Sequence, residues 1–359
     1  MQARMPPVLP DVRKIAVLRA NSLGDFIFVL PALDAVRAAY PDAEITLLGR
    51  EWHRAFLTGR PGAINRVLVI SKEWDSVAGW RETPPDVIAA SFVPLVRERF
   101  DLALQLHGGG RNSNPFIARL GARVTAGLRT PDAPPLDFWT PYVYYQPEVA
   151  RYLEVVARIG APAVTLEPRV AITEADRAEA RQAMPETGAP LVALHPGAMD
   201  PRRRWPPAQF AAVGDALAAM GATVVVTGTP DEQDTIAAIV GAMRAPAQDL
   251  CGKLSLGGLA GLLARCRLVV ANDTGPLHLA LAVGAPAVGI YWCGNLITSG
   301  PLTRTRHRPM ISWNVRCPVC STDCTRASCN HHESFVADVT VNDVLDAARD
   351  LWESSSMYD

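Results

Sequence analysis

The sequence predicts an α/β protein built from two doubly wound, Rossmann-like domains with a cleft between them. At 359 residues the chain is too long for a single compact core. Short apolar runs, typical of buried strands, alternate with stretches of helical periodicity, which indicates parallel sheets covered by helices. The same alternation occurs twice, before and after a charged helical stretch at 173–184 and a short linker at 186–190. Two similar domains follow from this repetition.

In the first half, residues 1–12 are rich in proline and lack the apolar core of a signal peptide, so a disordered lead-in is expected. The apolar runs that follow predict strands at 14–18, 45–48, 66–70 and 102–106. Helical spacing of apolar residues predicts helices at 26–40 and 148–160. The expected first domain spans residues 13–186.

The second half repeats the plan. Strands are expected at 191–194, 223–226, 268–271 and 287–291. Helices are expected at 207–220, 231–243, 256–264 and 279–282, and a final amphipathic helix at 340–352 begins with Thr340 and Asp343 as a capping box. The expected second domain spans residues 187–330, and residues 331–359 form a separate C-terminal segment.

Composition excludes several classes of protein. The formal net charge is −1, with 49% hydrophobic and 20% charged residues, which is typical of a soluble globular protein and argues against a nucleic-acid partner. No apolar run reaches the length of a membrane span. The cytoplasm is therefore the expected compartment, where cysteines stay reduced unless they hold a metal.

The most informative motif is the turn at 272–278, between an apolar strand and a helix. Thr274 suits the N-cap position, and Gly275 lets a ligand approach the backbone. Amides at the positive end of the helix would face outward, which favours a phosphate. Asp273 can accept hydrogen bonds from sugar hydroxyls, and His278 lies one turn further along. The alternative is an ordinary capped turn between a strand and a helix.

Three other loops follow predicted strands and therefore reach the same kind of sheet edge. Asp25 opens the first helix after the glycine turn at Gly24, although it also suits a helix-start carboxylate stabilised by the dipole. The arginine cluster at 202–204, beside Trp205, can grip a diphosphate or lie in solvent. Glu232 starts a helix after a glycine turn and could meet a ribose.

A segment near the C-terminus combines groups that bind metals: Cys317, Cys320, Cys324, Cys329, His331 and His332. These are enough ligands for a tetrahedral zinc site, and the C-x₂-C start favours one. The short later spacings fit a standard zinc finger poorly. The four cysteines are the candidate ligands of a possible structural zinc. Paired cysteines that close a surface loop, or free thiols, are the alternatives.

Together these motifs resemble the heptosyltransferases, the ADP-heptose:lipopolysaccharide family of inverting glycosyltransferases (glycosyltransferase family 9). The resemblance covers residues 13–352 and rests on the motifs at 22–25 with 30–33, at 273–278 with 284–286, and at Arg203 and Trp205. It implies the GT-B architecture, with the nucleotide sugar on the second domain and the acceptor on the first. It also implies that the last helix crosses back to the first domain.

The resemblance assigns Asp25 the role of the general base that deprotonates the acceptor hydroxyl. Phe28 stands where many members that act on the lipopolysaccharide core carry a histidine. Arg203, or Arg204 if the alignment shifts by one residue, takes the place of a lysine that contacts the donor phosphates. The other implied donor-binding residues are Glu232, Asp273, Thr274, Gly275 and His278. No catalytic metal is expected, because fixed cations and amides can stabilise the leaving group.

The expected function is the inverting transfer of heptose or a related sugar from an ADP-linked donor to a lipopolysaccharide-core or other cell-surface glycan. The expected partners are the nucleotide sugar and a lipid-linked or polysaccharide acceptor, and the acceptor allows peripheral contact with the cytoplasmic membrane. A non-catalytic sugar-nucleotide-binding or assembly protein of the same fold is the alternative. A nucleotide-sugar epimerase is less favoured, because the family motifs match well.

Overall fold

The computed structural model describes residues 7–70 and 83–355. The chain divides into two compact units, Met1–Pro168 and Arg169–Asp359. The division lies earlier than the expected boundary after residue 186, because helix α6 (Glu174–Ala183) packs on α9 (Leu256–Leu263) of the second unit. Glu179 joins the two by accepting hydrogen bonds from the backbone N–H and hydroxyl of Ser255.

The expected lead-in at 1–12 lies partly outside the described residues. Residues 7–12 contact the first unit and are not a free lead-in. The Leu9 amide donates to the Tyr40 hydroxyl at 3.2 Å, and the Arg123 side chain donates to the Pro10 carbonyl at 2.7 Å. The first domain therefore includes these residues.

The first unit holds a six-stranded parallel sheet in the order β3-β2-β1-β4-β5-β6. The strands are β1 (Lys14–Leu18), β2 (Glu44–Gly49), β3 (Arg66–Val69), β4 (Leu102–Gln105), β5 (Val124–Arg129) and β6 (Phe138–Pro141). The helices are α1 (Leu23–Ala39), α2 (Glu51–Leu57), α3 (Pro85–Arg97), α4 (Ser113–Ala118) and α5 (Glu148–Ala157). The four strands expected from the sequence are confirmed, whereas β5 and β6 were not expected.

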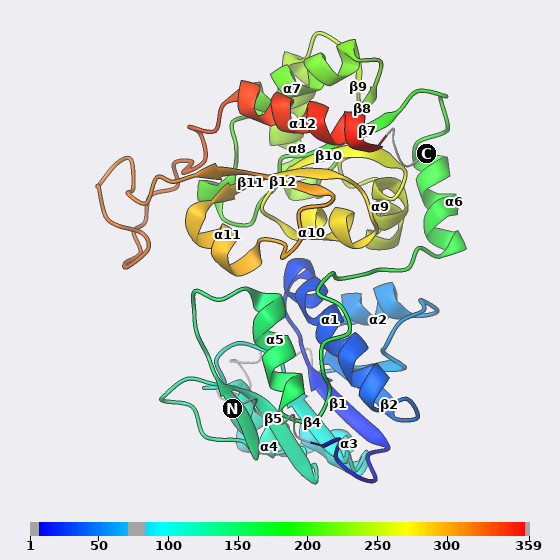
Figure 1. Cartoon of the computed structure of the whole chain (residues 1–359), viewed down its shortest axis with the longest axis vertical. Coiled ribbons are helices and arrows are strands. Elements are labelled where there is room, and N and C mark those ends of the chain that lie inside the picture. Colours follow the sequence, from blue (N-terminus) through cyan, green and yellow to red (C-terminus); the bar gives the residue numbers. More distant parts are fainter. Residues whose placement is uncertain (1–6, 71–82, 356–359) are drawn as a thin grey trace. The chain divides into compact units, whose positions relative to one another are not determined.

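The second unit holds another six-stranded parallel sheet, in the order β12-β11-β10-β7-β8-β9. Its strands are β7 (Leu191–His195), β8 (Thr223–Val226), β9 (Ala247–Asp249), β10 (Cys266–Asn272), β11 (Ala287–Trp292) and β12 (His307–Ser312). Beyond α6 and α9, its helices are α7 (Pro207–Ala219), α8 (Gln233–Ala242), α10 (Gly275–Ala282), α11 (Cys293–Ser299) and α12 (Val341–Ser355), with short 3₁₀ turns η2 (Pro201–Arg203) and η3 (Pro230–Glu232). Figure 1 shows these elements within each unit.

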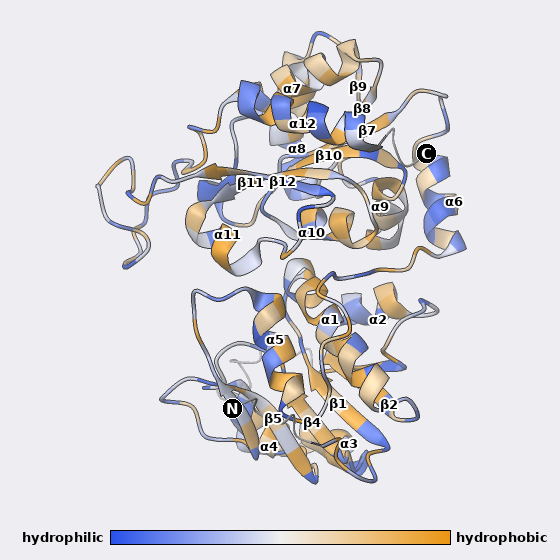
Figure 2. Ribbon diagram, viewed as in Figure 1, coloured by the Kyte–Doolittle hydropathy of each residue, from blue (hydrophilic) through white to orange (hydrophobic). Residues whose placement is uncertain are grey.

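Both sheets have the same topology, because in each the first strand lies beside the fourth. Strand order reverses at that pair, β1 with β4 and β7 with β10. In open α/β sheets, ligands bind outside the carboxyl ends of the strands at such a reversal. The central strands are apolar, as the orange strands in Figure 2 show, because helices cover both faces of each sheet. The fold thus defines one candidate edge in each unit.

The last helix, α12, packs on elements of the second unit, whereas the resemblance led us to expect that it crosses to the first domain. Its neighbours are α7, β10, β11 and β12. Val344, Ala348 and Leu351 are almost completely buried, in the same apolar cluster as residues of the second sheet. This apolar stripe covers a sheet face of its own unit, which is the physical reason for the packing seen there.

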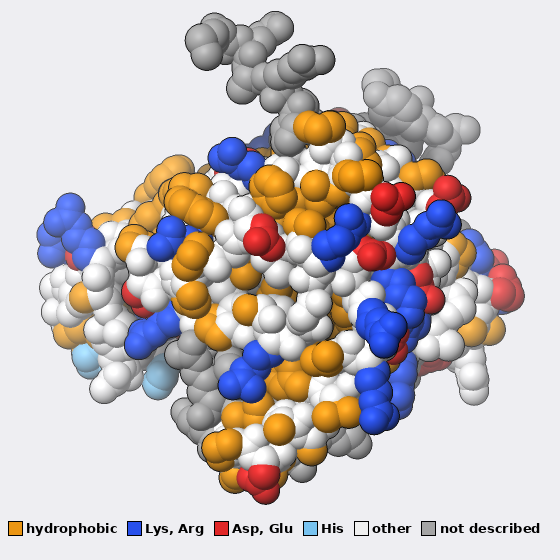
Figure 3. Space-filling model, turned by 90° about the horizontal axis from the view of Figure 1, so that it is seen from below, with side chains coloured by type: hydrophobic (Ala, Val, Ile, Leu, Met, Phe, Trp, Pro, Cys, Tyr) orange, Lys and Arg blue, Asp and Glu red, His pale blue; other side chains and the backbone are white. Residues whose placement is uncertain are grey.

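The surface carries interspersed charges. On the face shown in Figure 3, basic side chains lie close to acidic ones, and hydrophobic side chains are scattered between them. Ion pairs of this kind join Arg66 to Glu44 and Glu98 in the first unit. No helix among residues 7–70 and 83–355 is both long and apolar enough to cross a bilayer.

Candidate functional site

Three loops meet at the carboxyl edge of the second sheet. They follow β7, β8 and β10, and they carry the arginine cluster, Glu232 and the Asp273 turn. Asp273 is the centre of this arrangement, with an almost fully buried side chain. Its Oδ2 accepts from Arg203 Nη1 at 3.1 Å, and its Oδ1 lies 3.1 Å from His278 Nε2 and 3.0 Å from the Ser299 hydroxyl that donates to it.

The contacts keep Asp273 ionised. Burial alone would raise the pKa of this carboxyl, but the hydrogen bond and charge of His278 and the charge of Arg203 lower it below its ordinary value. The Ser299 hydroxyl acts in the same direction. Asp273 is therefore an anion that holds a cation, Arg203, at the edge of the sheet.

Arg203 is the arginine of the cluster that reaches the Asp273 turn. Its side chain is 25% exposed, and Nη1 also donates to the Asp273 carbonyl at 3.3 Å. Arg204 instead donates through Nε to the Ala198 carbonyl at 2.9 Å, within its own loop. Arg202 forms an ion pair with Asp200 at 2.7 Å. Of the two alternatives left open by the sequence, Arg203 is the one whose side chain reaches the Asp273 turn.

Trp205 and Asn272 fix the arginine loop to the sheet. The Trp205 side chain is 1% exposed, and its indole N–H donates to the Val339 carbonyl at 2.9 Å. The buried Asn272 amide accepts from the Trp205 backbone and donates to the Pro196 carbonyl. These bonds satisfy both ends of the amide, so the loop is rigid and its position relative to Asp273 is set.

Glu232 lies against two glycines, Gly197 of the loop after β7 and Gly228 of its own loop. A Cβ atom at Gly197 would stand 1.9 Å from Glu232 Oε1, and one at Gly228 would stand 2.9 Å from Oε2. The Thr229 amide donates to Oε2 at 2.8 Å. Only glycine at 197 therefore leaves room for this carboxylate, and Glu232 joins the same sheet edge as the arginine loop.

The start of α10 presents backbone to the same edge. Thr274 is the N-cap residue with extended backbone, as expected, but its side chain makes no capping hydrogen bond within this helix. Thr274 and Gly275 are partly exposed, whereas Asp273 and His278 on either side are buried. The first amides of a helix need partners from outside the helix, which makes this terminus suited to an anion.

In the first unit, Asp25 lies at the start of α1 and is 33% exposed. Its Oδ2 accepts from the Ser22 hydroxyl at 2.6 Å and from the Ser22 amide at 3.3 Å. Its Oδ1 forms an ion pair with Arg19 Nη2 at 3.0 Å. Asp25 thus caps the helix and also balances a buried cation.

Arg19 is a site residue that the sequence analysis missed. Its side chain is 1% exposed, and it also donates to Glu148 Oε2 at 3.1 Å, to the Tyr152 hydroxyl at 2.6 Å and to the Leu106 carbonyl at 2.8 Å. Burial raises the pKa of Tyr152 well above its ordinary value, so its phenol stays protonated and donates to Glu148. Arg19 lies within this network, which a buried guanidinium requires.

His107, which follows β4, completes the edge of the first sheet. Its Nδ1 accepts from the Ala20 amide at 3.3 Å. Burial, followed by the positive charge of Arg19, lowers the pKa of His107 to about 3. The ring is therefore neutral at pH 7 with its proton on Nε2, so it can donate a hydrogen bond but is a poor proton acceptor.

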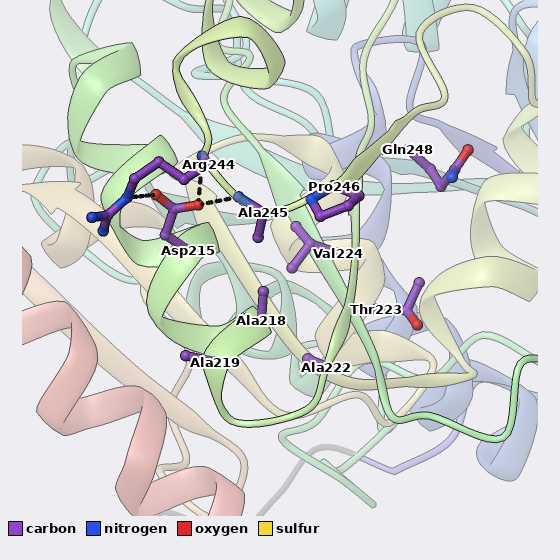
Figure 4. A pocket seen from close by; sticks show the side chains of 10 residues that line it. All are labelled: Asp215, Ala218, Ala219, Ala222, Thr223, Val224, Arg244, Ala245, Pro246 and Gln248. Carbon is purple, nitrogen blue, oxygen red and sulfur yellow. Dashed lines mark hydrogen bonds and ion pairs between the residues drawn. The ribbon is translucent and has the colours of Figure 1, made fainter.

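The pocket in Figure 4 lies at the opposite edge of the second sheet. Its volume is about 610 Å³, and it is lined by Thr223 and Val224 at the start of β8 and by the pair Asp215–Arg244, whose Oδ2 and Nε are 3.0 Å apart. The amino-terminal edge of a parallel sheet is not where such folds bind ligands. We therefore place the candidate site at the Asp273 edge.

The cysteine segment gathers a different ligand set from the one expected. Cys317, Cys320, Cys329 and His331 place their ligand atoms within 4.8 Å of one another. His331, not Cys324, is the fourth member. The Cys324 amide donates to the Val315 carbonyl at 2.9 Å, and its thiol lies 3.5 Å from the Thr322 carbonyl and 3.9 Å from the Cys329 sulfur, at the edge of this group. Hydrogen bonds with Thr322 lower the pKa of the exposed Cys320 thiol to about 6.

Two doubly wound domains, each with polar groups at the carboxyl edge of its sheet, are the GT-B architecture. Among proteins of that architecture the chain belongs to glycosyltransferase family 9 (heptosyltransferase), whose model matches residues 90–326. The matched region contains the arginine loop, Glu232 and the Asp273 turn, and it begins after Asp25.

Individual relatives match almost the whole chain. Lipopolysaccharide heptosyltransferase 3 of Escherichia coli is 22% identical over 347 residues, which cover 93% of this chain and 97% of the relative. A family 9 glycosyltransferase from Veillonella parvula has a TM-score of 0.77 at 22% identity, covering 95% and 97% of the two chains. The ADP-heptose lipopolysaccharide heptosyltransferase II of E. coli has a TM-score of 0.73 at 22% identity, covering 96% and 99%.

Proposed function

We propose that this protein transfers heptose from ADP-heptose to a sugar hydroxyl of a lipopolysaccharide core, with inversion at the anomeric carbon. The observation that carries the proposal is the Arg203–Asp273 pair beside the start of α10. A sugar diphosphate would be bound by the Arg203 cation, which the buried Asp273 carboxylate orients, and by the first backbone amides of α10 at the same sheet edge. The names of the relatives, lipopolysaccharide heptosyltransferases and an ADP-heptose heptosyltransferase, support the choice of sugar and acceptor.

In the proposed donor complex, Arg203 and the amides of Thr274 and Gly275 bind the diphosphate. Among the described residues, Arg203 donates only through Nη1, so its remaining N–H groups can reach phosphate oxygens. Asp273 orients Arg203 and accepts from sugar hydroxyls, while Glu232 binds the ribose. His278 holds Asp273 from the side of the helix.

In the proposed reaction, Asp25 accepts the proton of the acceptor hydroxyl as that oxygen attacks the anomeric carbon. The bond from this carbon to the diphosphate breaks, and ADP leaves with the bonding electrons. Arg203 and the α10 amides stabilise the charge on the departing phosphate, so no divalent metal takes part. His107 is not suited to be the base, because its Nε2 already carries a proton.

We further propose that the protein acts in the cytoplasm and contacts the membrane peripherally when it binds its lipid-linked acceptor. A water-soluble nucleotide sugar and an acceptor anchored in lipid meet at such a surface. The supporting observation is the family membership, together with the soluble composition of the chain.

Incubation with ADP-heptose and a heptose-deficient lipopolysaccharide core tests the function. We expect release of ADP and a core heavier by one heptose in mass spectrometry, at a rate unchanged by EDTA. Stabilisation by ADP-heptose without release of ADP would favour the non-catalytic alternative. Stabilisation by an unrelated nucleotide sugar alone would contradict the proposed donor.

A further inference from the structure

The segment between β12 and α12 is a long irregular loop of the second unit (orange in Figure 1). Residues 313–340 contain no helix or strand, apart from one bridge between Arg316 and Asp323. Two large apolar side chains, Trp313 and Val319, are 70% and 52% exposed. Loops longer than about 12–15 residues without secondary structure are uncommon in compact domains and are usually functional. The apolar core holds the end of this loop, where Val336 and Val339 are buried, but it does not include the stretch at 313–334 that contains the cysteines.

A tight turn brings the first two cysteines together. The Cys317 amide donates to the Thr322 carbonyl, and the Ser321 amide donates to the Cys317 carbonyl, both at 2.9 Å. Ser321 has φ +59°, a left-handed conformation that non-glycine residues rarely adopt. The turn folds the Cys-x₂-Cys stretch back on itself, so both sulfurs lie on one side.

The later part of the loop supplies the other two groups. Cys329 and His331 bring their ligand atoms within 4.8 Å of each other and of both earlier sulfurs. In a tetrahedral site with metal–sulfur bonds of about 2.3 Å, sulfurs stand about 3.8 Å apart. Small side-chain rotations are enough to reach that spacing.

His331 shows a second, independent sign of a missing ligand. Its Nδ1 is enclosed by protein and has no hydrogen-bond partner within the described residues. A buried nitrogen without a partner costs roughly 1–3 kcal/mol. A metal bound at Nδ1 would satisfy it.

We propose that Cys317, Cys320, Cys329 and His331 bind one tetrahedral transition-metal ion, zinc or iron. Three thiolates and an imidazole are the ligands that these ions accept, whereas magnesium and calcium require oxygen ligands. All seven cysteines are free thiols in the structure, so no disulfide competes for these sulfurs. This site is separate from the transfer reaction and does not depend on the proposed function.

The ion would stabilise the segment that holds the arginine loop. Just after His331, the Ser334 hydroxyl donates to the Arg204 carbonyl at 2.6 Å, and the Phe335 amide donates to the Arg202 carbonyl at 2.8 Å. The Arg202 guanidinium also lies 5.7 Å from the centre of the Phe335 ring. Metal binding is coupled to folding in such loops. The ion would therefore order Ser334 and Phe335, whose hydrogen bonds hold the loop that carries Arg203.

Metal analysis of the purified full-length protein tests the site. We expect about one equivalent of zinc or iron per chain, and elemental analysis distinguishes the two. Cobalt exchanged into the site should give the visible absorption of a tetrahedral thiolate complex. No metal after purification, together with no cobalt or zinc uptake by the reduced protein, would overturn the proposal. Two irons with inorganic sulfide would replace it with a cluster.

Matched variants test the ligand set. Cys320→Ser and His331→Ala should lose the metal, while Cys324→Ser and His332→Ala should keep it. Cys320 is exposed, so its variant should fold, and circular dichroism verifies this for each protein. Retention of the metal by folded His331→Ala, with loss in Cys324→Ser, would show that the structure assigns the fourth ligand wrongly.

Discussion

Asp25 makes two kinds of contact, and each matches one of the roles considered for it. Its bonds to Ser22 cap α1, which is a structural role. Its side chain is one-third exposed and lies at the carboxyl edge of the first sheet, where a catalytic base could contact an acceptor. The ion pair with Arg19 adds a complication, because loss of the carboxylate leaves a buried cation with fewer partners.

Asp25→Asn should separate these roles. Asparagine keeps the shape and can still cap the helix, but it cannot accept the proton. We expect transfer to fall by at least about 100-fold, with ADP binding unchanged and stability lowered by roughly 1–2 kcal/mol. Ser22→Ala is the matched control: it removes the capping hydroxyl at a cost of about 1 kcal/mol and should keep transfer. Equal loss of transfer in Asp25→Asn and Ser22→Ala would show that Asp25 acts by capping the helix and not as the base.

Arg203 should control donor affinity. Arg203→Ala removes a charge-assisted contact, so the dissociation constant of ADP measured by calorimetry should rise about 10–100-fold. Arg203→Lys should recover only part of this loss, because lysine keeps the charge without the planar fork. Affinity of the parent should also fall with salt more steeply than that of Arg203→Ala. Arg244→Ala, at the opposite sheet edge, should bind ADP normally. If Arg203→Ala binds ADP as tightly as the parent, Arg203 does not contact the phosphates.

The residues of the site differ in how far sequence reasoning could reach them. Asp25, Arg203 and Asp273 lie in the segments that connect predicted strands to the elements after them, so their sheet edge was predictable. Arg19 was not, because its partner Glu148 lies 129 residues away and only packing brings them together. The grouping of His331 with Cys317, Cys320 and Cys329 was not predictable for a similar reason, since the fold of the loop and not the spacing in the sequence brings these atoms together.

At the scale of elements, edge strands explain most of what the sequence did not predict. β6 and β12 are the outermost strands of their sheets, and they contain Pro141 and Pro309. Proline argues against a central strand but is tolerated at an edge, where its missing N–H has no partner to lose. Buried central strands such as β1 and β10 have continuous apolar runs, and those were predictable.

The packing of α12 gives a test of its assignment to the second unit. Leu351→Ala should lower the free energy of unfolding by about 2–5 kcal/mol, because it empties a buried position. Glu353→Ala, exposed on the same helix, should change it by less than about 0.5 kcal/mol. In denaturant titrations, the transition that Leu351→Ala shifts should be the one that ADP stabilises. A shift of the other transition would place α12 on the first unit.

At the scale of the whole molecule, buried neutral histidines predict sensitivity to acid. Burial is the main cause that lowers the pKa of His53, His107 and His307 to about 3. In the unfolded chain each titrates near 6.5, so between pH 6.5 and 3 the unfolded state binds more protons. Stability is thus fully present above pH 6.5 and is lost as the pH falls.

For the fully buried His53 and His307, the free energy of unfolding should fall by about 2 kcal/mol each between pH 7 and pH 5. Chemical denaturation across this range measures the slope. His53→Gln should flatten it, whatever its effect at pH 7, and the exposed His332→Ala should not. A pH-independent stability from 7 to 5 would show that these rings take up protons in the folded protein as readily as in the unfolded chain.

The division of the chain after Pro168 has an evolutionary and practical consequence. The proposed donor contacts all belong to the second unit, and the Asp25 network belongs to the first. Because α12 belongs to the second unit, one recombination event near residue 168 replaces the whole second unit, with all its proposed donor contacts, by that of another family member. If these proposed roles hold, donor choice and acceptor choice can diversify independently, and a chimera joined there should inherit its sugar preference from the parent of its C-terminal half.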